Sequence, residues 1–459
     1  MIEHIQRHDR CALWSTMGTG KTGATLTALE ESRYSTLTYP VLALGPLRVA
    51  RRVWRDEAAK WDHLKHLEVR FIYGDTVAAR QKALAPGADI YTINYELIPW
   101  LIKELGGKWP FKTVIADEAR KLKGFRGGFR RHPKSGKVYY QGAGGDRARA
   151  LGQVAHRSAR FIELTGTPAP RGVEDLWGQA WFLDKGHRLG ATFDSFSRRW
   201  FRPAYDGHGI EPLPTAQEQI QDRLADLCLS IDLADYMRIE APVFTRIEVE
   251  LPVVARKHYR DMERELFVEI EMHGIEAPNA GAKATKCLQL ANGACYVGDD
   301  ARTWIETHDT KLDALRSILE EAGGMPLLVA YQWQHDAERI LKAFPQARVL
   351  KTERDEDDFR AGRIPLLIAH PDGCGHGIEG FQHATNIIVF FGQWWDMELR
   401  DQIIGRIGPV RQMQSGYRRP VFVYDIISKD TLDEDVLYRH ATKASVQDTL
   451  LHAMKRRTK

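Results

Sequence analysis

A short glycine turn near the start of the printed sequence carries the residue types that hold a nucleoside triphosphate. Residues 17–22 read Met-Gly-Thr-Gly-Lys-Thr. Glycines let backbone N–H groups face phosphate oxygens, while Lys21 can reach the β- and γ-phosphates and the Thr22 hydroxyl can bind Mg²⁺. The predicted nucleotide-binding residues of this turn are Gly18, Thr19, Gly20, Lys21 and Thr22.

The residues on either side favour this interpretation over a plain glycine turn. Cys11 to Trp14 form an apolar run that suits a buried strand, and Gly23 to Glu30 suit a helix. The full phosphate-loop pattern has a further glycine five residues before Gly20, where this chain has Ser15. The strand–turn–helix context outweighs that departure.

Two adjacent carboxylates, Asp117 and Glu118, end another apolar run, residues 113–116. Asp117 is expected to hold Mg²⁺ through water, and Glu118 to orient and deprotonate the water that attacks the γ-phosphate. A solvated acidic turn is the alternative, which the buried strand before it disfavours. After a later strand, residues 164–168 add the hydroxyls of Thr165 and Thr167, which either relay the phosphate state or simply end the strand.

An alternation of strands and helices must position these residues. In the first half it predicts a mainly parallel, doubly wound α/β sheet, with ligands at the carboxyl ends of its strands. The strands expected there are 11–14, 41–44, 69–73, 89–93, 113–116 and 161–164. A second α/β pattern follows, with helices 311–322 and 335–344 and strands 326–331, 366–369, 386–391 and 421–426.

Between the two patterns, strand signals become sparse. Helices are expected at 216–229 and 255–273, with one strand at 245–251. We therefore predict a nucleotide-binding lobe over 1–193, a mainly helical insertion over 194–302 and a second lobe over 303–459. Trp54 and Trp61 are expected in a helix and in the core, and the acidic run 353–358 as a solvated loop.

The composition describes an ordinary globular chain of 459 residues with a net charge of only +4. The five cysteines form no C-x-x-C pair, which argues for reduced thiols in the cytoplasm, and no apolar run is long enough to span a membrane. Positive charge gathers in residues 120–137, which hold eight Lys or Arg and no acidic residue. Such a loop suits a phosphate backbone or, as the alternative, is a solvated surface insertion.

Taken in order, the motifs resemble those of superfamily 2 helicases. The series comprises Met-Gly-Thr-Gly-Lys-Thr at 17–22, Leu-Gly-Pro-Leu at 44–47, Asp-Glu-Ala-Arg at 117–120 and Leu-Thr-Gly-Thr-Pro at 164–168. Residues 375–382 resemble the glycine-rich motif V, and residues 402–412 resemble motif VI. Trp394-Trp395 and Thr431-Leu-Asp-Glu434 also fit the pattern. The resemblance spans nearly the whole chain and is greatest to the Swi/Snf-type DNA-dependent ATPases, in a compact version often carried by bacteriophages.

The resemblance implies two RecA-like lobes, with Mg²⁺·ATP in the cleft between them and nucleic acid lying across both. Lys21, Thr22, Asp117 and Glu118 would come from the first lobe, and the second would supply Arg406 as arginine finger. ATP binding would close the cleft and hydrolysis would reopen it. The other nucleotide-site residues implied for the second lobe are Gly377, Glu379, Gln402 and Arg411, the first two lying between the ATP cleft and the DNA track.

Two positions depart from the family pattern. A second arginine usually follows the first by three residues, and this chain has Pro409 there, so either Arg411 substitutes for it or one finger is missing. Related motors also place an adenine-reading glutamine well upstream of the phosphate loop. Gln6 lies too close to Lys21 to be its counterpart, so either the chain starts late or adenine specificity is relaxed.

These observations predict an ATP-driven motor that tracks along DNA, with duplex DNA favoured over single strands. A strand-separating DNA or RNA helicase is the alternative among enzymes, and a nucleotide-gated DNA-binding module with weak turnover is the alternative among binding proteins. We expect a monomer in the cytoplasm, that of the host if a phage encodes it, with no membrane partner. The resemblance leaves room for a directing partner from replication or recombination.

Overall fold

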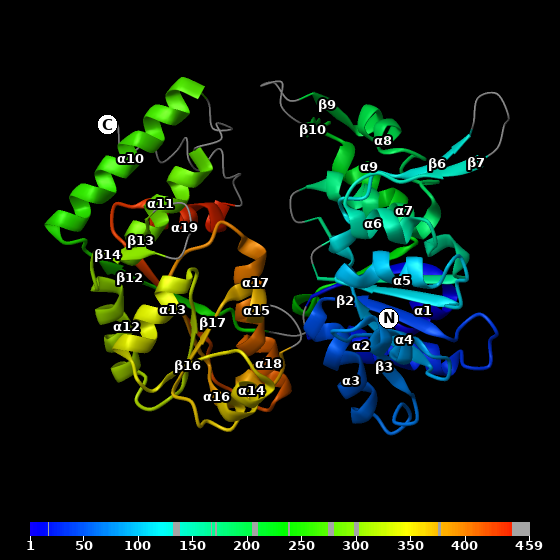
Figure 1. Cartoon of the computed structure of the whole chain (residues 1–459), viewed down its shortest axis with the longest axis horizontal. Coiled ribbons are helices and arrows are strands. Elements are labelled where there is room, and N and C mark those ends of the chain that lie inside the picture. Colours follow the sequence, from blue (N-terminus) through cyan, green and yellow to red (C-terminus); the bar gives the residue numbers. More distant parts are fainter. Residues whose placement is uncertain are drawn as a thin grey trace. The chain divides into compact units, whose positions relative to one another are not determined.

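The computed structural model describes residues 1–16, 18–131, 138–166, 168–169, 172–203, 210–236, 239–273, 280–297, 303–374 and 378–442. The chain divides into two compact units, Met1–Arg238 and Ile239–Lys459. Each unit is built on a parallel β-sheet with helices on both faces (Figure 1). The predicted α/β class with two doubly wound parallel sheets is confirmed.

The sheet of the first unit has seven parallel strands in the order β11-β1-β8-β5-β2-β4-β3. They are β1 (Arg10–Ser15), β2 (Val41–Gly45), β3 (Val69–Phe71), β4 (Ile90–Asn94), β5 (Thr113–Asp117), β8 (Arg160–Thr165) and β11 (Cys228–Ile231). Every residue of β2 and β4 is buried, as expected for strands covered on both faces. Because all the strands are parallel, the predicted phosphate turn after β1 and the carboxylates ending β5 lie at the same edge.

The helices of the first unit are α1 (Ile2–Arg7), α2 (Lys21–Glu31), α3 (Trp54–Lys60), α4 (Val77–Leu84), α5 (Ile98–Glu104), α6 (Asp146–Gly152), α7 (Leu176–Asp184), α8 (Phe193–Trp200) and α9 (Ala216–Leu224). Successive side chains of each strand point to opposite faces of the sheet, so the core has two parts. One face packs against α5, α6 and α7, and the other against α1, α2 and α3. This arrangement buries apolar side chains on both faces, as a doubly wound sheet requires.

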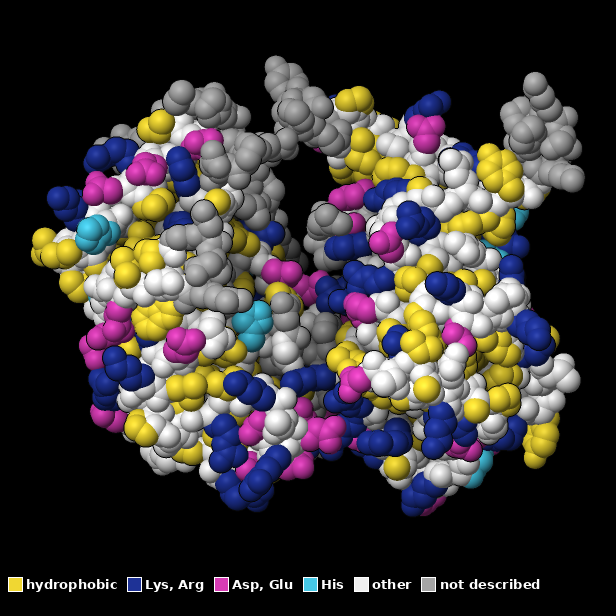
Figure 2. Space-filling model, viewed as in Figure 1, with side chains coloured by type: hydrophobic (Ala, Val, Ile, Leu, Met, Phe, Trp, Pro, Cys, Tyr) yellow, Lys and Arg dark blue, Asp and Glu magenta, His cyan; other side chains and the backbone are white. Residues whose placement is uncertain are grey.

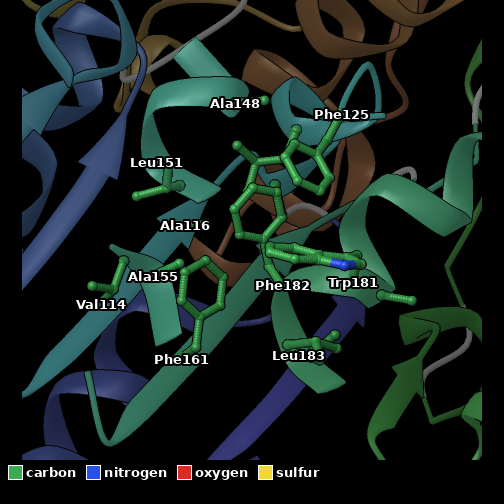
Figure 3. Close-up of a cluster of buried hydrophobic side chains, with 14 of the residues drawn as sticks. Val114, Ala116, Phe125, Ala148, Leu151, Ala155, Phe161, Trp181, Phe182 and Leu183 are labelled. Atoms are coloured by element: carbon green, nitrogen blue, oxygen red, sulfur yellow. The ribbon is translucent and has the colours of Figure 1, made fainter. Parts of the chain in front are cut away.

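An aromatic cluster supports the segment that follows the predicted catalytic carboxylates. The ring of Phe125 lies 4.5 Å from Trp181 and 4.9 Å from Phe182, measured between ring centroids. Figure 3 shows these rings together, beside Val114 and Ala116 of β5. Their burial fixes the segment that leaves the sheet after Glu118.

The structure describes residues 120–131 of the basic segment 120–137. A hairpin of β6 (Gly128–Arg131) and β7 (Val138–Gln141) projects from the aromatic cluster, where the Phe129 ring stacks on Trp181 at 5.7 Å. Residues 132–137 lie outside the described part of the chain.

The sheet of the second unit has six parallel strands in the order β12-β19-β18-β15-β17-β16. They are β12 (Val243–Val249), β15 (Leu327–Ala330), β16 (Ala347–Val349), β17 (Leu366–Ala369), β18 (Ile387–Phe390) and β19 (Phe422–Ser428). Two short antiparallel pairs complete the described strands, one in each unit: β9 (Phe201–Pro203) with β10 (Ile210–Pro212), and β13 (Ala294–Tyr296) with β14 (Trp304–Glu306).

The helices of the second unit are α10 (Val253–His273), α11 (Ala280–Asn292), α12 (Thr310–Glu321), α13 (Gln334–Ala343), α14 (Glu353–Arg360), α15 (Pro371–Cys374), α16 (Phe381–Ala384), α17 (Met397–Ile407), α18 (Pro409–Gln414) and α19 (Leu432–Thr442). Side chains of α12 and α13 pack on one face of the sheet, and those of α14, α16 and α17 on the other. The helices α10, α11 and α19 share a separate apolar cluster.

The segment predicted as a helical insertion, 194–302, is divided between the two units rather than forming a part of its own. Its first portion adds α8, α9 and the edge strand β11 to the first unit, and its second portion begins with β12, which pairs with β19 of the second. The predicted helix 216–229 ends at Leu224, because Cys228 to Ile231 pair with β1 instead.

Two further expectations differ from the structure. Trp54 is fully buried as predicted, but Trp61 is 49% exposed, because α3 ends at Lys60 and the indole Nε1 of Trp61 donates to Glu57. The acidic run 353–358 forms helix α14 rather than a loop, since Thr352 and Asp355 make a reciprocal capping box at its start.

Among the described residues, no helix is both long enough and apolar enough to cross a membrane. Lys and Arg side chains occur over the face of each unit that Figure 2 draws, with acidic side chains between many of them.

Candidate active site

The glycine turn adopts the backbone conformation that its sequence predicts. Gly18 and Gly20 have φ angles of 84° and 78°, in the left-handed region that favours glycine. Gly20 is the N-cap of α2, and its carbonyl oxygen accepts from the N–H of Ala24 at 2.9 Å. A Cβ built on Gly20 meets no atom within 4 Å, so its conformation rather than crowding accounts for the glycine, and the space beside it is open. Met17 lies outside the described residues.

Hydroxyl groups hold the turn in place. The Oγ of Ser15 lies 2.9 Å from Thr19 Oγ1, which also donates to the carbonyl oxygen of Thr16 at 3.0 Å. The Nζ of Lys21 donates to the carbonyl oxygen of Ser15 at 2.6 Å, so the ammonium group lies under the turn. Ser15 therefore has a structural role at the position where the full phosphate-loop pattern has glycine.

Asp117 shares an electrostatic environment with Lys21. Burial and, to a smaller extent, the neighbouring charge of Glu118 together raise the pKa of Asp117 from 3.8 to about 7. The positive charge of Lys21 acts in the opposite direction and lowers this pKa. The Oη of Tyr95 donates to the backbone carbonyl of Asp117 at 2.9 Å, an interaction that the sequence did not reveal. A half-buried carboxylate within the electrostatic reach of an ammonium group fits a site for a metal–triphosphate complex.

Glu118 has a strained backbone. Its φ of 60° and ψ of 52° place a non-glycine residue in the left-handed region, a conformation that clusters at functional sites. Its Oε2 lies 3.2 Å from the Nε of Arg120, an ion pair that the sequence also did not reveal. Arg120 is the last residue of the Asp-Glu-Ala-Arg motif and the second residue of the 3₁₀ turn Ala119–Leu122.

The other hydroxyl residues predicted near this edge are only partly described. Thr165 ends β8 and is buried. Thr167 lies outside the described residues. Thr22 is the second residue of α2, one residue after Lys21.

In the second unit, Gln402 and Arg406 lie one turn apart on α17, on the same side of the helix. Both are buried, with 6% and 8% of their surface exposed. The Nη1 of Arg406 donates to the carbonyl oxygen of Ile378 at 3.0 Å, and Gln402 Nε2 donates to Glu398 Oε1 at 3.1 Å. Arg406 therefore joins motif VI to motif V.

Arg411 approaches the same segment from the next helix. Its Nη1 lies 3.4 Å from Glu379 Oε1, an ion pair within the predicted nucleotide-site residues. Pro409 is the first residue of α18, where a proline is favoured because its missing N–H would have no helical partner. The proline that replaces the family's second arginine thus starts the helix that carries Arg411. Gly377 lies outside the described residues.

The described residues fit ATP and Mg²⁺ within the first unit. Such a ligand needs the groups found here: the open glycine turn, the ammonium group of Lys21, the hydroxyl of Thr22 and the half-buried carboxylate of Asp117. Arg406, Arg411 and Glu379 form a separate cluster within the second unit.

Comparison with known proteins connects these groups to a family. No family model matches the chain. Protein p41 of Acyrthosiphon pisum secondary endosymbiont phage 1 is 49% identical over 464 residues, which cover 100% of this chain and 97% of p41. The human DNA annealing helicase and endonuclease ZRANB3 is 26% identical over 299 residues, which cover 62% of this chain and 24% of ZRANB3. This chain therefore corresponds to about a quarter of the length of ZRANB3.

A solved structure of the Sulfolobus solfataricus SWI2/SNF2 ATPase core in complex with dsDNA is 20% identical, with a TM-score of 0.41, and the match covers 94% of this chain and 86% of that one. With the motif series and the two parallel sheets already described, the sequence relatives lead to one assignment. The chain belongs to the same family as the phage protein p41, and it is similar to Swi/Snf-type superfamily 2 helicases.

Proposed function

We propose that this protein is an ATP-driven motor that moves along DNA, with duplex DNA as its preferred track. One observation supports the proposal: β1 and β5 are parallel strands of the same sheet, so the glycine turn after β1 and the carboxylates at the end of β5 lie at one edge, where the charge of Lys21 lowers the pKa of Asp117. A phosphate-binding lysine next to a metal-binding carboxylate is the arrangement that hydrolyses nucleoside triphosphates.

The proposed roles follow from the chemistry of each group. Lys21 would bind the β- and γ-phosphate oxygens, while Thr22 and Asp117 would hold Mg²⁺. When bound there, Mg²⁺ neutralises charge on the transferring phosphoryl group. Glu118 would position the attacking water and accept its proton. Its present ion pair with Arg120, at 3.2 Å, keeps the carboxylate oriented at the edge of the sheet.

The cluster in the second unit would supply positive charge. Arg406 is the proposed arginine finger, and Arg411 is proposed to replace the arginine that Pro409 displaces. Both side chains are already held by the segment at Ile378 and Glu379, which preorganises them.

DNA is the proposed track for two reasons. The name of the relative ZRANB3 describes a DNA annealing helicase. In this chain, the pKa of Lys121, which precedes the hairpin β6–β7, is lowered first by partial burial and then by repulsion from Arg120, while the carboxylates of Glu96 and Glu118 act in the opposite direction. A phosphate backbone would relieve that repulsion.

The proposal is tested by measuring ATP hydrolysis with no nucleic acid and with single-stranded DNA, duplex DNA, forked DNA and RNA in parallel. We expect the greatest stimulation by duplex DNA, and its loss in Lys21→Ala. Turnover that is absent in the wild type, or unchanged in Lys21→Ala, would reject the motor and favour a nucleotide-gated binding module.

Strand separation is distinguished from tracking by a second pair of assays. A fluorescent strand-displacement assay reports unwinding, and a triplex-displacement assay reports movement along intact duplex. We expect activity in the second and little in the first.

A further inference from the structure

The segment after β11 lies beside the glycine turn. Ser15 of β1 is level with Ile231 of β11, and the N–H of Thr16 donates to the carbonyl oxygen of Ile231 at 3.3 Å. The N–H of Leu233 in turn lies 3.4 Å from Thr16 Oγ1. The 3₁₀ turn Leu233–Asp235 and the residue after it, Tyr236, therefore begin next to the strand end from which the phosphate turn departs.

The order of the strands sets the direction in which a nucleotide bound at this turn extends. The sheet runs β11-β1-β8-β5, so the carboxylates that end β5 lie on one side of β1 and β11 lies on the other. The terminal phosphate must point toward Asp117 and Glu118 for hydrolysis. A nucleotide bound in this direction would extend its ribose and base toward the opposite side, over the end of β11.

The side chains at that end suit the base and ribose rather than phosphate. Tyr236 is 73% exposed, and its ring makes no aromatic contact among the described residues. Asp232 and Asp235 stand close to it in the chain, and their carboxylates disfavour phosphate but can accept hydrogen bonds from ribose hydroxyls.

Gln6 is excluded as the base contact by its place in the fold. Its Nε2 donates to Glu31 Oε2, and Glu31 is the last residue of α2, whereas the phosphate turn precedes the first residue of that helix. An 11-residue helix spans about 16 Å, so Gln6 lies far from the turn.

We propose that Tyr236 stacks on the nucleobase of the bound nucleotide and thereby supplies the base contact of this motor. The proposal rests on the proposed nucleotide site at Lys21. Every base has a π-face, so a stacking contact accepts bases with little discrimination, unlike a hydrogen-bonding glutamine.

The test measures the dissociation constants of ATP and of inorganic tripolyphosphate by calorimetry, with Mg²⁺, for the full chain. The variants are Tyr236→Ala, Tyr236→Phe and, as a matched control, Tyr34→Ala. Tyr34 is 97% exposed and follows the far end of α2. We expect Tyr236→Ala to weaken ATP binding by roughly 5- to 150-fold while tripolyphosphate binding stays unchanged. Tyr236→Phe keeps its ring and should bind ATP as the wild type does, and so should Tyr34→Ala.

Two outcomes would reject the stacking contact without rejecting the proposed function. Unchanged ATP affinity in Tyr236→Ala, or an equal loss of ATP and tripolyphosphate binding, rejects the stacking contact while leaving the phosphate site intact. If instead the wild type binds neither ligand, or Lys21→Ala binds both as well as the wild type does, the nucleotide site itself is wrong and the inference fails with it.

Discussion

At the scale of single residues, Glu118 stands out because its backbone lies in the left-handed region. That backbone and the ion pair with Arg120 set the orientation of its side chain. We predict that Glu118→Gln lowers the kcat of ATP hydrolysis by roughly 10²–10⁴-fold, since an amide cannot accept the proton of the attacking water. ATP affinity should stay close to that of the wild type. Glu321→Gln, at the exposed end of α12, is the control and should hydrolyse ATP normally. Equal turnover in the two variants would remove Glu118 from the mechanism.

Asp117 gives a pH-dependent prediction for the nucleotide-free protein. Its folded pKa of about 7 lies above the unfolded value of 3.8, so the folded state binds the proton more tightly than the unfolded state does. This contribution to stability is complete below pH 4 and is lost as the pH rises to 7. Asp117→Asn has no proton to lose there. Its free energy of unfolding, relative to that of the wild type, should therefore increase by about 1–3 kcal/mol between pH 5 and 7 and level off above.

Denaturant unfolding of both proteins at pH 5, 6, 7 and 8 measures this difference. Added Mg²⁺ should reduce it by stabilising the carboxylate of the wild type. A difference that does not vary with pH would show that Asp117 is not desolvated in solution.

Mutation can distinguish the role of Arg411 in ATP hydrolysis from that of Pro409. If Arg411 supplies the missing positive charge, Arg411→Ala should lower kcat by about 10²–10³-fold, the typical effect of removing one preorganised donor. Pro409→Ala should retain turnover close to that of the wild type, because the proline only starts α18. Steady-state ATPase kinetics measure the kcat of both variants. Normal turnover in Arg411→Ala would leave Arg406 as the sole arginine finger.

At the scale of elements, α7 presses against the turn that follows the carboxylates. A Cβ on Gly178 would lie 2.8 Å from the carbonyl oxygens of both Leu122 and Lys123. Gly178→Ala should therefore destabilise the protein by about 1–3 kcal/mol, although alanine is normally the better helix residue. Gly281→Ala in α11 is the matched control, because a Cβ there meets nothing within 4 Å. Thermal or denaturant unfolding measures both changes, and an equal effect of the two would contradict the close packing.

The sequence was most informative where strands are buried on both faces. The strands β2, β4 and β5 are mostly apolar and buried along nearly their whole length, so their positions and the site at their ends could be predicted. The edge strand β11 could not, because Cys228 to Ile231 continue an apparently helical run and pair only through contacts distant in sequence. The Thr352–Asp355 capping box at the start of α14 does predict a helix, but the acidic composition of the segment favoured a loop.

The features of the candidate site also differ in whether the sequence predicts them. The residue types of the glycine turn and of Asp117-Glu118 follow from spacing, whereas the contacts of Tyr95 and Arg120 depend on tertiary packing. The structural meaning of Pro409 also required the observed break between α17 and α18.

At the scale of the whole molecule, the hairpin β6–β7 offers a test of DNA binding. Lys123 is paired with Asp175, and Arg126 donates to two backbone carbonyls, so their removal would disturb the fold. Lys121 and Arg130 are better targets. Replacing both by alanine should weaken duplex binding and reduce the slope of log K against log salt by about 2. Lys342→Ala, on α13, is the control. If the salt slope is unchanged in the double variant, duplex DNA contacts other residues than Lys121 and Arg130.

The central claim is that ATP hydrolysis drives movement along intact duplex DNA. Its most direct measurement is displacement of a labelled third strand from a triplex, with ATP, by the wild type and by Lys21→Ala. We predict ATP-dependent displacement by the wild type and none by Lys21→Ala. Hydrolysis stimulated by duplex DNA without any displacement would contradict it.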